Sequence, residues 1–198
     1  MAVERGWKGA KPPAMKAVGV FGGSFDPVHH GHLAIAQAAL EQVPLDRVVF
    51  VPSRRSPLKE ELPAASERDR LAMLELAMRE AARFSVSRCE LDRPAPSYTV
   101  DTLEALAGEG RLFLIVGADA ARDLTRWKSP DRVRQLATLV IARRPGSDHA
   151  DPAAIWLDTP LLDISARDLR ARAARRRSLR YLVPDAVWRY IEEHSLYR

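Results

Sequence analysis

Short hydrophobic runs alternate along the chain with longer stretches in which hydrophobic and polar residues recur at helical spacing. The runs are rich in valine, isoleucine and phenylalanine and are short enough for buried parallel strands. They lie at Ala17 to Phe21, Arg47 to Val51, Arg111 to Val116 and Thr138 to Ala142. Helical patterns occur between them, at His30 to Gln42, Ser66 to Arg83 and Thr99 to Ala107. Strands that alternate with helices predict an α/β fold with a doubly wound, mostly parallel sheet.

The remaining segments extend this pattern. Weaker strands are predicted at Phe84 to Cys89 and Ala154 to Leu157, and helices at Ser165 to Arg177 and Pro184 to His194. Ser66 and Asp69 form a capping pair at the start of their helix. Stretches rich in proline, glycine and charge predict loops over Pro52 to Ala65 and Arg144 to Pro152. We expect a flexible N-terminal tail over residues 1–16 and a single domain over residues 17–198 with a helical C-terminal part.

Composition narrows the classes of protein and partner. The 198 residues are 46% hydrophobic and 29% charged, which is typical of one globular domain. The formal charge of +5 suits nucleic acid or a small polyanion such as a nucleotide. Cys89 is the only cysteine, so the chain can form neither an internal disulfide nor a cysteine-cluster zinc site. With no apolar run of about 20 residues and no apolar core of signal-peptide type, we expect a cytoplasmic protein that does not enter a membrane.

The first strand leads directly into a glycine- and histidine-rich segment from Gly22 to Leu33. Open α/β sheets bind ligands at the carboxyl ends of their strands, so this segment is the predicted site. Gly22 and Gly23 let backbone N–H groups approach a phosphate closely. The helix that follows turns its positive end toward the same place, and an anion is therefore the expected ligand.

Three histidines stand in this segment, at positions 29, 30 and 32. The segment matches neither the P-loop nor the dinucleotide-binding fingerprint. Residues three apart share a helix face, so His29 and His32 can point at one ligand, with open space at Gly31 between them. Two other interpretations stay open, a metal site and polar capping of a helix. Zinc is less favoured because no carboxylate or thiol stands at a metal-ligand spacing from the histidines.

The segment Gly22 to Leu33 resembles the first signature of the nucleotidyltransferases that carry a His-x-Gly-His motif. Ile164 to Arg170 resembles their second signature, which opens a helix beside the triphosphate. Within these Rossmann-like enzymes the chain is most similar to the bacterial nicotinate-nucleotide adenylyltransferase family. The further likeness lies at Pro96 to Leu103, at Gly117-Ala118-Asp119 with Trp127, and from Tyr181 to Arg198. Arg167 stands where the family more often has threonine, Leu58 replaces a frequent histidine, and Arg176 replaces a common loop glycine.

The resemblance implies a reaction and a set of site residues. The phosphate of nicotinate mononucleotide would attack the α-phosphorus of ATP, giving nicotinate adenine dinucleotide and pyrophosphate, a step in NAD biosynthesis. The implied catalytic residues are His29, His32 and Arg170. The implied ATP-binding residues are Gly22, Gly23, Ser24, Phe25, Gly31, Gly117, Asp119 and Ser165. The implied acceptor-binding residues are Lys59, Tyr98, Thr99 and Trp127, with Trp127 stacked on the pyridine ring.

Mg²⁺ is expected with ATP, held largely by phosphate oxygens and water, so no protein metal site is predicted.

Two alternatives to this function remain. Another transferase of the same superfamily would use nicotinamide mononucleotide or pantetheine phosphate as acceptor. An arginine-rich nucleic-acid-binding module is less favoured, because Arg170 to Arg180 has no aromatic residue among its charges. The sequence does not determine the preference for nicotinate over nicotinamide mononucleotide. It also leaves the oligomeric state open, and a homodimer is one of the states compatible with it.

Overall fold

A computed structural model describes residues 15–57, 61–143, 151–160 and 162–198. Within these ranges six strands form one parallel sheet in the order β3-β2-β1-β4-β5-β6. The strands are β1 (Ala17–Gly23), β2 (Arg47–Pro52), β3 (Phe84–Val86), β4 (Arg111–Gly117), β5 (Ala137–Ala142) and β6 (Ile155–Leu157). This order reverses direction between β1 and β4 and defines a Rossmann-like doubly wound sheet, as the sequence predicted.

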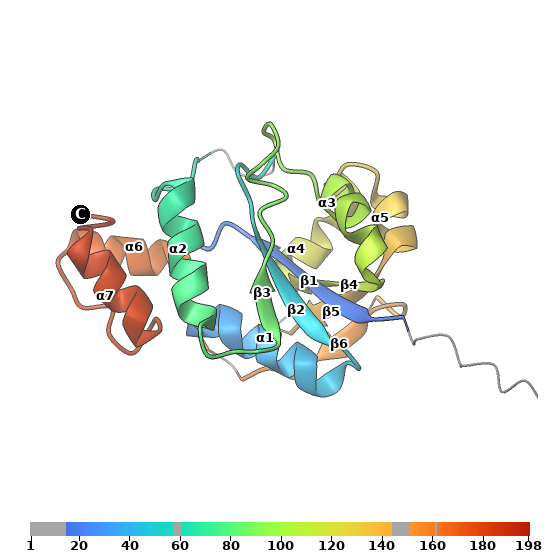
Figure 1. Ribbon diagram of the computed structural model, residues 1–198, viewed down its shortest axis with the longest axis horizontal. Helices are drawn as coiled ribbons and strands as arrows, with labels where there is room; N and C mark the ends of the chain where they lie inside the picture. The colour runs from blue at the N-terminus through green and yellow to red at the C-terminus, as the bar shows by residue number, and fades with distance from the viewer. Residues whose placement is uncertain (1–14, 58–60, 144–150, 161) are drawn as a thin grey trace, which may run out of the picture.

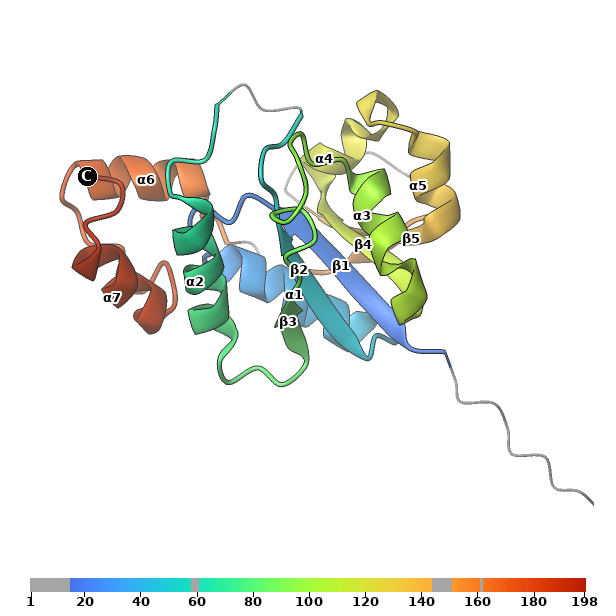
Figure 2. The same ribbon diagram turned by 45° about the horizontal axis from the view of Figure 1, so that its top comes forward.

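Helices cover both faces of the sheet (Figures 1 and 2). They are α1 (His30–Gln42), α2 (Glu67–Met78), α3 (Thr99–Leu106), α4 (Ala118–Arg122), α5 (Pro130–Leu136), α6 (Ala166–Ala174) and α7 (Asp185–Glu193). One hydrophobic cluster joins α1, α2, α6 and α7 to the sheet, and a second joins α3, α4 and α5 to the opposite face. The C-terminal helices α6 and α7 lie beyond α2 at one end of the molecule.

Strand β1 shows how the sequence builds the two faces. Side chains alternate across a strand, and here Val18 and Val20 enter the cluster with α3 to α5 while Phe21 enters the cluster with α1 and α2. Gly19 lets Leu45 pack closely against this second face of the strand, because a Cβ at this position would lie 2.9 Å from Leu45 Cδ1. The strand is therefore buried on both sides, which explains its nearly continuous hydrophobic run.

Several boundaries differ from the predicted ones. Helix α1 has the predicted bounds, but α2 ends at Met78 and not at Arg83. The segment after Met78 forms turns, with hydrogen bonds from Ala81 N to Met78 O and from Phe84 N to Ala81 O, because the chain must reverse to enter β3. Strand β3 is shorter than predicted, and α6 ends at Ala174.

Helices α4 and α5 and the 3₁₀ turn between them, Leu124–Arg126, were not predicted. Both helices are short, so neither shows a full helical hydrophobic period. Helix α5 does carry a start signal, since Ser129 precedes Pro130 at the first helical position.

Residues 1–14 lie outside the described part of the chain, so the flexible tail stays a prediction, as does the single domain that follows it. The predicted loop at Arg144 to Pro152 also falls largely outside this part. Among the described helices, none combines the length and the hydrophobicity that crossing a membrane requires.

Candidate active site

A cavity of about 440 Å³ opens at the carboxyl ends of β1 and β4, where the strand order reverses. Open α/β sheets bind ligands at such points. Its wall includes eight of the predicted site residues, which are Gly22, Gly23, Ser24, Tyr98, Thr99, Gly117, Asp119 and Trp127. The fold therefore brings the first residues of the predicted nucleotide turn and the predicted acceptor residues to one cavity, although up to 105 residues separate them in sequence. The cavity wall does not include four other predicted residues of this segment, which are Phe25, His29, Gly31 and His32.

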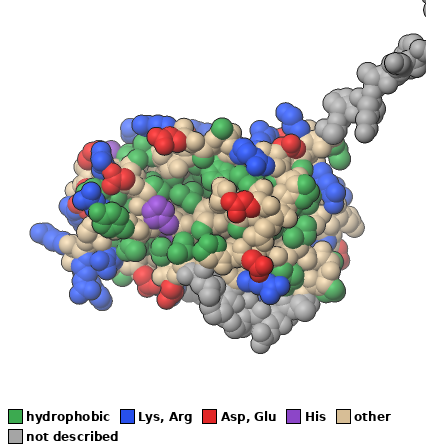
Figure 3. All heavy atoms as spheres, turned by 90° about the horizontal axis from the view of Figure 1, so that it is seen from below, with side chains coloured by type: hydrophobic (Ala, Val, Ile, Leu, Met, Phe, Trp, Pro, Cys, Tyr) green, Lys and Arg blue, Asp and Glu red, His purple; other side chains and the backbone are tan. Residues whose placement is uncertain are grey.

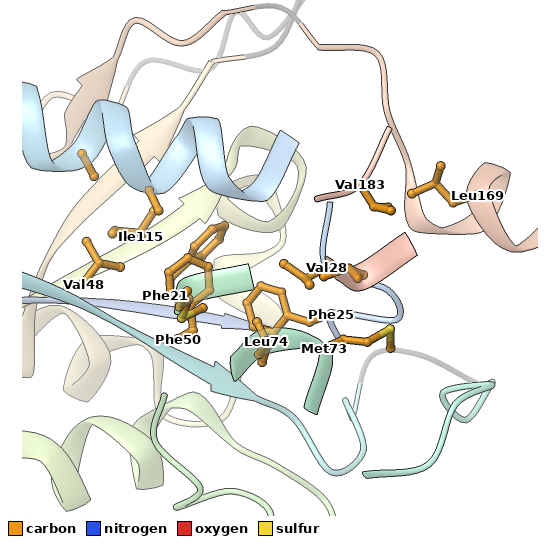
Figure 4. Close-up of a cluster of buried hydrophobic side chains, with 14 of the residues drawn as sticks. Phe21, Phe25, Val28, Val48, Phe50, Met73, Leu74, Ile115, Leu169 and Val183 are labelled. Carbon is orange, nitrogen blue, oxygen red and sulfur yellow. The ribbon is translucent and has the colours of Figure 1, made fainter. Parts of the chain in front are cut away.

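The two glycines at the strand ends leave room on the cavity wall. A Cβ added at Gly22 or at Gly117 would meet no atom within 4 Å. Gly23 differs, because its Cβ would lie 3.1–3.3 Å from the ring of Phe25. Phe25 itself is fully buried and has a left-handed backbone with φ of 47°. Its ring packs against Phe21 and Phe50, with centroids 5.7 and 5.5 Å away (Figure 4).

His29 and His32 are brought together at the start of α1. His29 is the N-cap residue, and its backbone N–H donates to Nδ1 of His32 at 3.3 Å. The two rings stack with centroids 3.7 Å apart and planes 27° apart. His29 is only 5% exposed. The two histidines thus cap the helix, as one interpretation of the sequence predicted. The same arrangement holds two imidazoles side by side at the positive end of the helix.

Gly31 lies against the ring of His29. A Cβ at Gly31 would approach His29 Nδ1 to 3.0 Å and Cε1 to 3.1 Å, and would lie 3.7 Å from the carbonyl oxygen of Ile164 in the second signature. The open space expected at Gly31 between the two histidines is thus wrong, because the His29 ring fills it, and the glycine permits this close packing.

The second signature lies beside the first through Arg170. Its Nη1 donates to the carbonyl oxygen of Asp26 at 2.9 Å and lies 3.7 Å from the Asp26 carboxylate. Ser165 is the N-cap of α6, where its hydroxyl accepts from Asp168 N at 3.1 Å. Neither residue lines the larger cavity; Ser165 lines a neighbouring one of about 280 Å³ along α6. A role for both in holding the triphosphate stays a prediction.

The acceptor side of the cavity is built around the start of α3. Tyr98 is its N-cap residue, and Lys128 Nζ lies 4.6 Å from the Tyr98 ring centroid and 3.0 Å from Asp101. Trp127 ends a 3₁₀ turn, and its buried Nε1 makes no hydrogen bond to any described residue. Asp119 lies in the first turn of α4, 4.0 Å from Arg122. Lys59 lies outside the described residues.

Sequence reasoning missed two buried groups. Behind the β1–α1 turn, the carboxylate of Asp26 accepts from the backbone N–H groups of residues 64 and 65 at 2.7 and 3.0 Å and from the Tyr197 hydroxyl at 2.8 Å. Burial and the adjacent carboxylate raise the pKa of Tyr197 well above its usual value. In the cavity wall, Thr102 donates to Glu90 at 2.5 Å. No local sequence signal marks these pairs, since their partners are distant along the chain.

Among the described residues, no group of three or more histidine, cysteine, aspartate or glutamate side chains is placed to hold an ion.

Comparison with known proteins identifies the family. The cytidylyltransferase-like family model matches residues 20–172. A protein of Thermus thermophilus named "Probable nicotinate-nucleotide adenylyltransferase" is 49% identical over 186 residues, covering 91% of this chain and 99% of the relative. A protein of the same name from a Roseiflexus species is 45% identical over 194 residues, covering 91% and 98%.

The fold also matches a solved structure, the Plasmodium falciparum nicotinic acid mononucleotide adenylyltransferase complexed with NaAD. The TM-score is 0.75 at 17% sequence identity, over 92% of this chain and 97% of that one. At this identity the structural likeness shows the fold alone, and the sequence relatives show the family. On these matches, the chain belongs to the cytidylyltransferase-like family and, within it, to the nicotinate-nucleotide adenylyltransferases.

Proposed function

We propose that this protein transfers the adenylyl group of ATP to nicotinate mononucleotide, giving nicotinate adenine dinucleotide and pyrophosphate in NAD biosynthesis. The observation that carries the proposal is the cavity in which the β1–α1 turn faces the segments of Tyr98 and Trp127. The names of the relatives and the NaAD complex of the structural neighbour support the same reaction. We place it in the cytoplasm.

The reaction is a direct displacement. A phosphate oxygen of nicotinate mononucleotide forms a bond to the α-phosphorus of ATP, and the bond to the bridging oxygen of the β-phosphate breaks. The electron pair leaves with pyrophosphate, so no covalent enzyme intermediate is needed. Such transfers depend mainly on positioning and on stabilising charge at the phosphates.

His29 and His32 are the proposed donors to the phosphates. They stand at the N-terminus of α1, where the helix dipole and the backbone N–H groups also favour negative charge. Their stacking fixes the direction of both rings. Arg170, held on the Asp26 carbonyl, would add positive charge from α6. Mg²⁺ would bind with ATP and neutralise charge on the phosphate oxygens.

The acceptor would lie on the other side of the cavity. We assign stacking on the pyridine ring to Trp127 and contacts to the nicotinate carboxylate to N–H groups near Thr99 and Trp127. Both segments are on the cavity wall, and Thr99 is the first residue of α3, where backbone N–H groups have no partner within the helix. Asp119 would contact the ribose or adenine of ATP, and Lys59 the acceptor phosphate.

The arginine-rich C-terminal segment gives little support to the nucleic-acid alternative. Basic side chains gather at the end of the molecule where α6 and α7 lie, but acidic side chains stand among them (Figure 3). Within the arginine-rich segment, Arg170 donates to the carbonyl oxygen of Asp26 and Arg172 to that of Ser178. Beyond the segment, Arg189 pairs with Asp185 at 2.6 Å, and Arg198 with Glu192. Nucleic-acid binding by a surface needs several cations free to meet phosphates.

The test is pyrophosphate release from ATP and Mg²⁺ with nicotinate mononucleotide, nicotinamide mononucleotide or phosphopantetheine as acceptor. We expect release with the first, weaker release with its amide, and a loss of about 100-fold for His32→Ala, the cost of removing one preorganised donor. His194→Ala, a histidine stacked on Tyr190 in the distant C-terminal helix, is the matched control. Activity only with another acceptor would refute the substrate, and no release with any acceptor would refute the enzyme.

A further inference from the structure

Arg70 is an arginine in the hydrophobic core. It lies on α2 and is 1% exposed, and the neighbouring Met73 and Leu74 are fully buried. A buried guanidinium is costly unless it is paired and hydrogen-bonded. Burial lowers the pKa of Arg70, and the nearby charges of Asp26 and Glu67 offset part of this effect. An apolar residue would fill this position at less cost, so the guanidinium needs a specific reason.

The guanidinium holds the backbone of the β1–α1 turn. Nη1 of Arg70 donates to the carbonyl oxygen of Ser24 at 2.8 Å, across 46 residues of sequence. Ser24 is on the wall of the larger cavity. The peptide between Ser24 and Phe25 is trans, so its C=O and N–H bonds point in opposite directions. Fixing the Ser24 carbonyl toward Arg70 therefore turns the N–H of Phe25 away from Arg70.

The turn has a backbone that needs such support. Phe25 has φ of 47°, in the left-handed region that bulky residues rarely adopt. Left-handed residues in turns direct backbone N–H groups into a concave anion-binding arrangement. The buried ring of Phe25 holds one side of this residue, against Phe21 and Phe50 (Figure 4). Arg70 holds the peptide that precedes it.

A second guanidinium acts on the same turn. Arg170 donates to the carbonyl oxygen of Asp26 at 2.9 Å, as Arg70 does to that of Ser24. Two backbone oxygens that carry partial negative charge are thus engaged by cations.

We propose that Arg70 is a positioning residue for the nucleotide: by holding the Ser24 carbonyl, it directs the Phe25 N–H toward the phosphates of ATP. Arg70 does not touch the ligand itself. The inference rests on the proposed function, because that function places the ATP phosphates at this turn.

The experiment compares Arg70→Met and Arg70→Lys with the wild type. We measure the KM for ATP, the KM for nicotinate mononucleotide, kcat and the unfolding temperature. Arg70→Met should raise the KM for ATP about tenfold, the effect of one lost or misdirected hydrogen bond, and leave the acceptor KM within about twofold. Arg70→Lys keeps the charge and a donor, so its KM for ATP should rise only about threefold.

Met78→Ala is the matched control, because Met78 is buried on the same helix and its thioether offers the turn no hydrogen-bond donor. It should lower the unfolding temperature without changing the KM for ATP. Arg70→Met with a wild-type KM for ATP, or with both KM values raised equally, would overturn the proposal. If Arg70→Met does not fold, a wild-type KM for ATP in Arg70→Lys overturns it. If the wild type makes no nicotinate adenine dinucleotide, the proposed function fails, and ATP binding by calorimetry then tests Arg70 separately.

Discussion

Replacing Gly31 by alanine should lower the activity of the enzyme without lowering its stability. The Cβ would lie 3.0 Å from His29 Nδ1 and 3.1 Å from Cε1, so the ring must move by a few tenths of an ångström. The backbone does not resist the change, because Gly31 is helical and its φ lies outside the left-handed region. Alanine is the better helix former by up to about 1 kcal/mol. The strain therefore falls on the imidazole and leaves the helix intact.

The two effects have opposite signs. A gain of at most about 1 kcal/mol raises the unfolding temperature by roughly 2–4 °C in a chain of this size. Displacement of a positioned donor by a fraction of an ångström lowers the rate, and a 1 Å error costs about 100-fold. We expect Gly31→Ala to lose about 4- to 10-fold in kcat/KM while its unfolding temperature stays equal or rises slightly.

Pyrophosphate release and thermal unfolding measure both quantities on one preparation. Gly108→Ala is the control, since a Cβ there meets no atom within 4 Å and both quantities should stay at wild-type values. Wild-type activity in Gly31→Ala would refute the importance of the His29 ring position. A fall of several degrees in unfolding temperature would show that the helix moves and the imidazole does not.

Three further predictions concern partly buried side chains. Tyr197→Phe removes the 2.8 Å hydrogen bond to the Asp26 carboxylate and should lower the free energy of unfolding in urea by about 2 kcal/mol; an unchanged value would contradict this contact. The pKa of Asp69 is lowered overall: burial raises it, but hydrogen bonds from Ser66 and Tyr190 lower it by more. Its stabilising effect is thus present above the usual aspartate pKa and lost as pH falls through the lowered one, so Tyr190→Phe should raise the Asp69 pKa measured by NMR and weaken resistance to acid. Burial raises the pKa of Cys89, so the thiol should react with iodoacetamide at pH 8 more slowly than free cysteine; an equal rate would refute its burial.

The strands and long helices could be predicted because their signals are local. Strand β1 is buried on both faces and is one apolar run in the sequence, and α1 was predicted with the bounds observed. Helices α4 and α5 are too short for such a pattern. Ser129, with φ of 50°, also places an unusual backbone before α5 that composition does not reveal.

The site likewise has residues that the sequence predicts and contacts that it does not. The residues of the β1–α1 turn are adjacent in sequence, so their spacing alone placed them at the strand end. Arg70 could not be predicted, because arginine is usually exposed and its partner Ser24 is 46 residues away. Asp26 binds Arg170 and Tyr197 across 144 and 171 residues, and such pairings emerge only from the complete fold.

Those long-range contacts join Asp26, in the β1–α1 turn, to the C-terminal part of the chain. Its backbone oxygen accepts from α6 and its carboxylate from the penultimate residue, while His30 N, at the start of α1, donates to the carbonyl oxygen of Leu182 at 3.3 Å. The geometry of the β1–α1 turn is therefore held by contacts with the C-terminal part of the chain. Because Asp26 is 2% exposed, its carboxylate would be left buried with fewer donors if that packing failed. The contacts that join the C-terminal part of the chain to the sheet thus also hold the turn at which we propose that the phosphates bind.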